Sequence, residues 1–245
     1  MKIFCFYEPD PIFSHQESII EYWKFSWENF GFEPIVLNKT HAKQHPLFNF
    51  FEKKISALHY IIKDKTHITT YGMNCYIRWL AYATQSEDFF LVSDYDVINL
   101  GMLPRDIEKK FHFMAGHCPC LVSGKNTDFN LISNMFISES GNRLKDIINN
   151  DYVKNAPHYH DQEFFVSSFN EDFLKKYDIF LTNELDIEQT HPYLPKNKLV
   201  HVSHSYVHKL MIEGFDFTVD INNIYPNDRH RIDIIEFLIK RFIKI

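Results

Sequence analysis

The stretch Phe89-Phe90-Leu91-Val92-Ser93-Asp94-Tyr95-Asp96-Val97 is the most informative part of the chain, because an apolar run leads directly into two carboxylates. A short apolar run bounded by polar residues predicts a buried strand. In open α/β sheets, ligands bind at the carboxyl ends of the strands, which is where Asp94 and Asp96 would lie. Two neighbouring carboxylates repel each other and lose hydration there, so a bound divalent cation is the natural partner for them.

The residues before this stretch predict the beginning of an α/β sheet. Residues 2–7 and 33–37 are apolar enough to form two strands, and between them residues 15–30 have helical spacing that Gly31 ends. A strand, a helix and a second strand in this order indicate a parallel pair joined by a right-handed crossover.

Further elements follow from the same patterns. Helices are expected over residues 51–63, 70–85, 144–153 and 161–169. Strands are expected over residues 111–115, 131–137 and 198–202. The polar residues 118–130 are expected to form a long, mobile loop. These elements predict an α/β fold with a mixed, mainly parallel sheet flanked by helices, in one domain over residues 1–225.

Residues 226–245 differ from the rest of the chain, because they predict a basic amphipathic helix. Basic residues outnumber acidic ones there, and an apolar stripe recurs at helical spacing: Ile232, Ile235, Leu238, Ile239, Phe242 and Ile243. Such a helix can dock on the body of its own domain, lie on a membrane surface or begin a truncated second domain. All three interpretations fit the sequence.

The composition excludes some classes of function. The net charge is −6, which argues against nonspecific nucleic-acid binding by the whole surface. Only 7 glycines occur, and the chain has neither a Walker A pattern nor a GxGxxG motif. A nucleotide would therefore have to be held in another way, and a metal ion on carboxylates is one such way.

The four cysteines favour a reducing compartment. Cys5 and Cys75 fall in a predicted strand and a predicted helix, and Cys118-Pro119-Cys120 lacks the spacing of a metal site and has no second pair. The chain enters a strand at once and has no apolar run long enough to span a bilayer. We therefore expect a cytoplasmic protein without a signal peptide, in which the C-terminal helix is a candidate for peripheral contact with the inner face of the membrane.

The Asp94-Tyr95-Asp96 motif has two readings besides a metal site. In the simplest one the acids cap a turn or a following helix. In the other, Asp94-Tyr95-Asp96-Val97 fits the nucleophile motif of haloacid-dehalogenase-type phosphatases. Those enzymes also need a downstream acidic pair for magnesium, and this chain has no Asp-Asp dipeptide. Their nucleophile strand is also normally the first strand, whereas a β-α-β unit precedes it here.

A set of motifs in a fixed order favours a third reading. The first strand ends at Tyr7, a basic residue (Arg78) lies on the helix before the acids, Asp94-Tyr95-Asp96 follows, and Leu199-Val200-His201 forms a late strand. In this order the chain resembles the GT-A fold superfamily of metal-dependent glycosyltransferases, especially its glycogenin-like and galactosyltransferase-like members. The resemblance covers residues 1–210 and implies a Rossmann-like fold that binds a nucleotide-diphosphate sugar.

The resemblance also implies roles for individual residues. Asp96 would ligate Mn²⁺ or Mg²⁺ directly, and Asp94 would contact the ribose and the metal shell. Arg78 would place its guanidinium, a fixed positive charge, next to the sugar or phosphate. The alternative is a surface arginine paired with Glu87 or Asp88. Tyr7 and Tyr95 would bind the donor, and together with Tyr159 they could stack on the base or sugar.

Two further choices stay open at this level. The third metal ligand is expected to be His201, which matches the late-strand motif, or His204 if the chain turns after Val202. An acid that accepts the proton of the attacking hydroxyl is expected at Asp161 or Glu163, since GT-A enzymes carry such acids at a helix start near the acceptor. The alternative for Asp161 is a helix N-cap.

Together these features predict a metal-dependent glycosyltransferase that moves a sugar from a UDP-sugar, rather than a GDP-sugar, to a glycan or glycolipid. The polar loop and residues 156–159 would border the acceptor site. The alternatives are the phosphatase, with Asp94 and Asp96 as its motif, and a noncatalytic glycan-binding module on a degenerate transferase fold.

Overall fold

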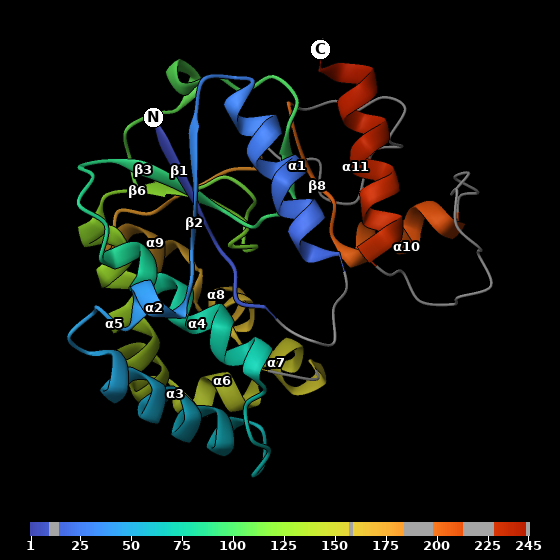
Figure 1. The fold of residues 1–245 in the computed structure, drawn as a ribbon. Coiled ribbons are helices and arrows are strands. Elements are labelled where there is room, and N and C mark those ends of the chain that lie inside the picture. The colour runs from blue at the N-terminus through green and yellow to red at the C-terminus, as the bar shows by residue number, and fades with distance from the viewer. Residues whose placement is uncertain (10–14, 157–158, 184–197, 213–227, 244–245) are drawn as a thin grey trace.

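A six-stranded sheet with the order β2-β1-β3-β6-β5-β7 forms the centre of the protein (Figure 1). The computed structural model describes residues 1–9, 15–156, 159–183, 198–212 and 228–243. The strands of this sheet are β1 (Lys2–Phe6), β2 (Glu33–Leu37), β3 (Phe90–Ser93), β5 (His112–Phe113), β6 (Leu121–Gly124) and β7 (Phe180–Leu181). A separate two-stranded sheet pairs β4 (Val97–Asn99) with β8 (Leu199–His201).

The main sheet is mixed and mostly parallel, as the sequence predicts. β1 runs parallel to both β2 and β3, and β5 runs parallel to β7. Only β6 runs antiparallel to its two neighbours in this sheet, β3 and β5. The β1-α1-β2 unit at the start of the chain is therefore confirmed, with α1 (Gln16–Glu28) as its crossover helix.

Helices cover both faces of this sheet because its central strands are apolar on both sides. Phe4 and Phe90 point toward a core made by helices that include α4 and α5, whereas Ile3 and Leu91 point toward α1. The remaining helices are α2 (Lys39–Ala42), α3 (Phe48–Ile62), α4 (Thr70–Ala83), the 3₁₀ helix η1 (Pro104–Asp106), α5 (Asn126–Asn142), α6 (Leu144–Asn149), α7 (Asp151–Asn155), α8 (Asp161–Ser168), α9 (Glu171–Lys176), α10 (His204–Ile212) and α11 (Asp228–Phe242).

Helix α1 fixes both ends of the segment that carries the two acids. Its indole nitrogens donate hydrogen bonds into that segment: Trp23 Nε1 to Ser93 Oγ at 2.9 Å and Trp27 Nε1 to the carbonyl of Val97 at 3.0 Å. Both indoles are fully buried. The helix ends before Gly31, whose φ of +84° is a left-handed conformation that glycine adopts without strain. The crossover helix thus positions residues 93–97 directly.

Two sequence-based expectations are wrong. Residues 131–137 are not a strand but the middle of α5, and residues 118–130 are not a mobile loop, because they contain β6 and the first turn of α5. The buried positions Phe129, Ile132 and Phe136 are three and four residues apart, which is helical spacing. A seven-residue apolar window was too short to separate this period from that of a strand. The expected helix over residues 144–153 is also divided, into α6 and α7.

The C-terminal helix α11 docks on the body of the domain. Ile232, Ile235 and Leu238 are almost fully buried, in a cluster that also includes residues of α1, β8 and α10. Figure 1 shows α11 beside α1 at one side of the molecule. The interpretation as a docked terminal helix is therefore confirmed, and the apolar stripe is covered in this arrangement. Among the helices that the structure describes, none is long and apolar enough to cross a membrane.

Candidate active site

Asp94, Asp96 and His201 come together beyond the end of β3. The acids follow β3 directly, and the antiparallel pairing of β4 with β8 places Val97 opposite His201. One potential ligand atom from each of Asp94, Asp96 and His201 lies within 4.8 Å of the others. The structure therefore gathers three of the four residues that the sequence predicts as metal ligands.

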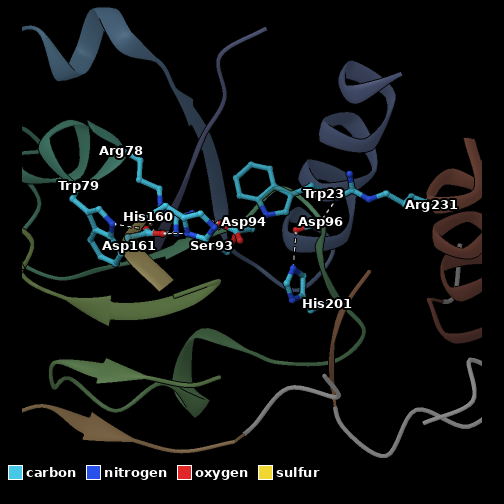
Figure 2. A network of polar contacts seen from close by, with 10 residues as sticks. All are labelled: Trp23, Arg78, Trp79, Ser93, Asp94, Asp96, His160, Asp161, His201 and Arg231. Carbon is cyan, nitrogen blue, oxygen red and sulfur yellow. Dashed lines mark hydrogen bonds and ion pairs between the residues drawn. The ribbon is translucent and has the colours of Figure 1, made fainter. Parts of the chain in front are cut away.

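Asp96 is the more deeply held of the two acids and is 8% exposed. Its Oδ1 lies 3.3 Å from Nε2 of His201, and its Oδ2 accepts a hydrogen bond from Nη2 of Arg231 (Figure 2). Burial alone would raise the pKa of Asp96, but the positive charges of His201 and Arg231 hold it below its ordinary value. Asp96 is therefore an ionised carboxylate at neutral pH, which is the state that a metal ligand needs.

The pKa of Asp94 is shifted in the opposite direction from that of Asp96. Burial raises the pKa of Asp94 to about 6, although the charge of Arg78 opposes this shift and that of Asp96 adds to it. Nη1 of Arg78 donates a hydrogen bond to Oδ1 of Asp94. A further positive charge beside Asp94, such as a cation, would favour its ionised form.

Arg78 connects the site to helix α8. Its Nε and Nη2 donate to Oδ2 of Asp161 at 3.0 and 2.6 Å, while Nη1 reaches Asp94. The alternative pairing of Arg78 with Glu87 or Asp88 is wrong, because Arg78 forms its ion pairs with Asp94 and Asp161, and Glu87 is paired with Lys2. The guanidinium fork, held from both sides, has a fixed orientation at the edge of the cavity described below (Figure 2).

Asp161 and Glu163, the two predicted proton acceptors, accept hydrogen bonds from other groups of the protein. Asp161 is 1% exposed and accepts a further hydrogen bond from Trp79 Nε1 at 2.9 Å. Glu163 caps the start of α8 by accepting from the backbone nitrogen of His160 at 2.9 Å. Neither side chain lines the cavity. Their geometry suits the anchoring of Arg78 and of the helix start.

A cavity of about 340 Å³ opens beside the acids. The side chains that matter for its chemistry are Tyr7, Arg78, Asp94, Tyr95, Asp96 and Arg231. The rings of Tyr7 and Tyr95 meet edge to face with their centroids 5.9 Å apart, and Gln16 Nε2 donates to the hydroxyl of Tyr95 at 3.0 Å. All the predicted donor-binding residues therefore line one cavity. Tyr159 does not, because it is buried beside Tyr76 and is 2% exposed.

The two candidate histidines take different positions. His201 ends β8 and belongs to the group with Asp94 and Asp96, whereas His204 begins α10 and lines the cavity. Within the described residues, His204 is absent from the groups whose spacing would hold a metal ion. The geometry therefore favours His201 as the third ligand.

Arg231 is a charged residue of this site that was not predicted from the sequence. It lies on α11, is 2% exposed, and its guanidinium also stands 5.7 Å from the ring centre of Tyr95. The sequence did contain a signal, because Arg231 is four residues before Ile235 and seven before Leu238 and so shares their buried face. An arginine in the apolar stripe of a helix needs a partner, and Asp96 is that partner.

Comparisons of this chain with protein-family models, with curated proteins and with solved structures find no match. What the site binds must therefore be inferred from its own residues.

The residues present fit a divalent cation. His201 Nδ1 is buried without a hydrogen-bond partner in the described structure, and buried Asp96 Oδ1 has the ion-pair contact with His201 Nε2 at 3.3 Å but no hydrogen bond. Buried polar atoms of this kind are costly unless a ligand satisfies them. Two carboxylates with one imidazole form a donor set suited to Mn²⁺, and carboxylates alone suit Mg²⁺. Asp94, Asp96 and His201 would hold such an ion.

Proposed function

We propose that this protein is a metal-dependent glycosyltransferase that uses a nucleotide-diphosphate sugar, with UDP as the nucleotide. The observation that carries the proposal is the convergence of Asp94, Asp96 and His201, in which both acids line a cavity that is also lined by two arginines and three tyrosines. The acceptor would be a glycan or glycolipid, as the resemblance to GT-A enzymes implies.

The charges of the cavity suit a diphosphate. Breaking a bond between a sugar and a diphosphate leaves negative charge on the phosphates. A bound Mn²⁺ or Mg²⁺ supplies Lewis-acid stabilisation of that charge. Arg78 and Arg231 add two guanidinium groups to the lining of the same cavity, and a planar guanidinium binds phosphate oxygens through paired N–H donors.

The aromatic residues suit the other half of the donor. Tyr7 follows the end of β1 and Tyr95 lies between the acids, so both rings face the space next to the proposed metal ligands. Aromatic faces bind bases and sugars by stacking. Tyr7 and Tyr95 would therefore hold the uridine or the sugar, while Asp94 contacts the ribose.

The fold supports the same proposal. The mixed, mostly parallel sheet and the small β4–β8 ladder bring a late strand to the two acids, which is the arrangement that the GT-A resemblance implies. Asp161, predicted as a proton acceptor, would instead act as a positioning residue that holds Arg78 toward the phosphates. Glu163 would fix the start of α8, which carries Asp161.

Calorimetry of UDP binding with and without Mn²⁺ tests the proposal. We expect Mn²⁺ to strengthen UDP binding at least about tenfold, equivalent to about 1.4 kcal/mol. Asp96→Asn should remove this gain while the protein remains folded. Asp106→Asn is the matched control, because Asp106 is paired with Lys198 at the surface and does not line the cavity.

Equal UDP binding with and without Mn²⁺ would contradict the proposal. Hydrolysis of an aryl phosphate that is lost in Asp94→Asn would support the phosphatase instead. A parallel titration with GDP tests the expected preference for UDP.

A further inference from the structure

A second group of potential ligands lies beside the first. One potential ligand atom from each of Cys118, Cys120 and His201 lies within 4.8 Å of the others. Cys120 is fully buried, His201 is 8% exposed and Cys118 is partly exposed. The spacing Cys118-Pro119-Cys120 alone does not indicate a metal site, so it is the fold that adds the third donor.

Two separate pairings in the fold bring these residues together. β6 runs antiparallel to β3, with Ser93 opposite Leu121, so Cys120 lies next to Asp94, whose backbone nitrogen donates to the carbonyl of Cys120 at 2.8 Å. The β4–β8 ladder brings His201 to the same place from the other side of the acids. The position of the thiols is therefore fixed by backbone hydrogen bonds and not by the thiols themselves.

The turn before Cys120 is also well determined. The backbone nitrogen of Cys118 donates to the carbonyl of Ala115 at 3.1 Å, and Gly116 takes a φ of +59°. The positive φ favours glycine at this position, and a Cβ there would lie 2.8 Å from the side-chain oxygen of Asn183, so that side chain would have to move. Pro119 restricts the backbone between the two cysteines.

The chemistry of these donors differs from that of the acids. Two thiols and an imidazole are soft ligands that select Zn²⁺ over Mn²⁺ or Mg²⁺. In a tetrahedral zinc site the ligand atoms are roughly 3.5 to 3.8 Å apart, given Zn–S bonds of about 2.3 Å and Zn–N bonds of about 2.0 Å. Because the ligand atoms lie within 4.8 Å of one another, each pair has to approach by about 1.3 Å at most. Nδ1 of His201 is buried without a hydrogen-bond partner, which is a second sign that a ligand is missing.

We propose that Cys118, Cys120 and His201 form a binding site for a soft divalent cation, with Zn²⁺ as the expected ion. On binding, each cysteine loses its thiol proton to solvent and becomes a thiolate ligand. Cys118 is the partly exposed member of the group and is where an ion would arrive. The fourth position would be taken by water, as in zinc sites with three protein ligands.

This site has a consequence for the neighbouring one, which rests on the proposed function. His201 belongs to both groups of ligands, so one imidazole ring would have to serve both ions. Zn²⁺ on the cysteines should therefore compete with Mn²⁺ on the acids and weaken Mn²⁺-dependent UDP binding.

Cobalt spectroscopy of the reduced, metal-free protein tests the site itself. Co²⁺ substitutes for Zn²⁺, and its bond to a thiolate gives a charge-transfer band in the near ultraviolet. We expect this band to saturate at one equivalent, to disappear when Zn²⁺ is added, and to require more than about tenfold more Co²⁺ in Cys118→Ser and in Cys120→Ser. Cys5→Ala is the matched control, because Cys5 is a buried cysteine of β1 outside any such group in the described structure.

The absence of the band in the wild-type protein, or its persistence in the double variant Cys118→Ser/Cys120→Ser, would overturn the proposal. Cys118 is partly exposed, so its variant should fold, and circular dichroism checks this. A separate titration of UDP with Mn²⁺ tests the competition: Zn²⁺ should weaken binding in the wild-type protein and not in Cys118→Ser. If UDP binding never depends on Mn²⁺, the proposed function fails while the cobalt result stands alone.

Discussion

Arg231 donates a hydrogen bond through Nη2 to Oδ2 of Asp96, which lies 135 residues earlier in the chain. The same guanidinium donates through Nε to the carbonyl of Val202 at 3.0 Å. The C-terminal helix therefore contributes directly to the wall of the candidate active site. This relationship links the stability of the protein to the charge of the site, because Asp96 is buried and ionised.

Arg231→Ala should destabilise the protein by about 3 kcal/mol, because it leaves the buried carboxylate of Asp96 with one fewer cationic partner. The loss should be smaller with Mn²⁺ present, since the metal would compensate the same charge. Urea unfolding with and without Mn²⁺ measures both effects. Arg229→Ala is the control on the same helix, because its side chain is 46% exposed and its ion pair with Asp233 is long, at 3.7 Å. A loss that Mn²⁺ does not reduce would argue against a metal on Asp96.

Asp161→Asn should lower stability by about 2 kcal/mol, because an amide is a weaker acceptor for the buried Arg78 than a carboxylate. It should also weaken UDP binding, since Arg78 loses its fixed orientation. Asp151→Asn provides the comparison: Asp151 likewise begins a short helix, but its side chain is 93% exposed. Unchanged UDP affinity in Asp161→Asn would mean that Asp161 has only a structural role.

His160 should make stability depend on pH. Burial lowers the pKa of His160, but hydrogen bonds and charge from Asp161 and Glu163 raise it to about 9, against an ordinary value near 6.5. Because the folded-state pKa is the higher one, the stabilisation is complete below about pH 6.5 and is lost as the pH rises through about 9. The loss is at most about 3 kcal/mol. The wild type should have a larger unfolding free energy than His160→Gln at pH 6, and the two values should become nearly equal at pH 9.5. The same difference at both pH values would show that His160 is not charged in the native state.

Leu238→Ala should cost about 3 kcal/mol, because Leu238 is fully buried where α11 meets the body of the domain. Thermal unfolding measures the loss. Lys240→Ala, two residues later and with a side chain that is 72% exposed, should change stability by less than about 0.5 kcal/mol. Similar effects of the two substitutions would mean that the helix does not dock as described.

The intact protein should not float with liposomes, because the apolar stripe of α11 is buried against the domain. A helix binds a membrane surface through exposed apolar area, with basic residues as a secondary attraction. Flotation on neutral and anionic vesicles tests this. Binding of the intact protein to both kinds of vesicle would indicate that α11 leaves its docking site.

Local patterns were sufficient for the beginning of the sheet and for the acidic motif. The β1-α1-β2 unit and strand β3 follow from apolar periodicity and from Gly31, which act over a few residues. The same patterns failed at residues 131–137, where a short apolar run is compatible with both a helix and a strand. There the choice depends on packing of α5 against α4, which is a contact between distant segments.

The sequence by itself therefore determined which residues to propose as ligands of a metal and a nucleotide, because Asp94, Asp96, His201 and Arg78 could be named from their order and from their neighbours. Only the tertiary structure decided their partners. Arg231 meets Asp96 because α11 docks beside α1, and Cys118 and Cys120 meet His201 because β6 pairs with β3 while β8 pairs with β4. The physical reason is that local periodicity depends on neighbouring residues, whereas these contacts depend on how the whole chain buries its apolar surface.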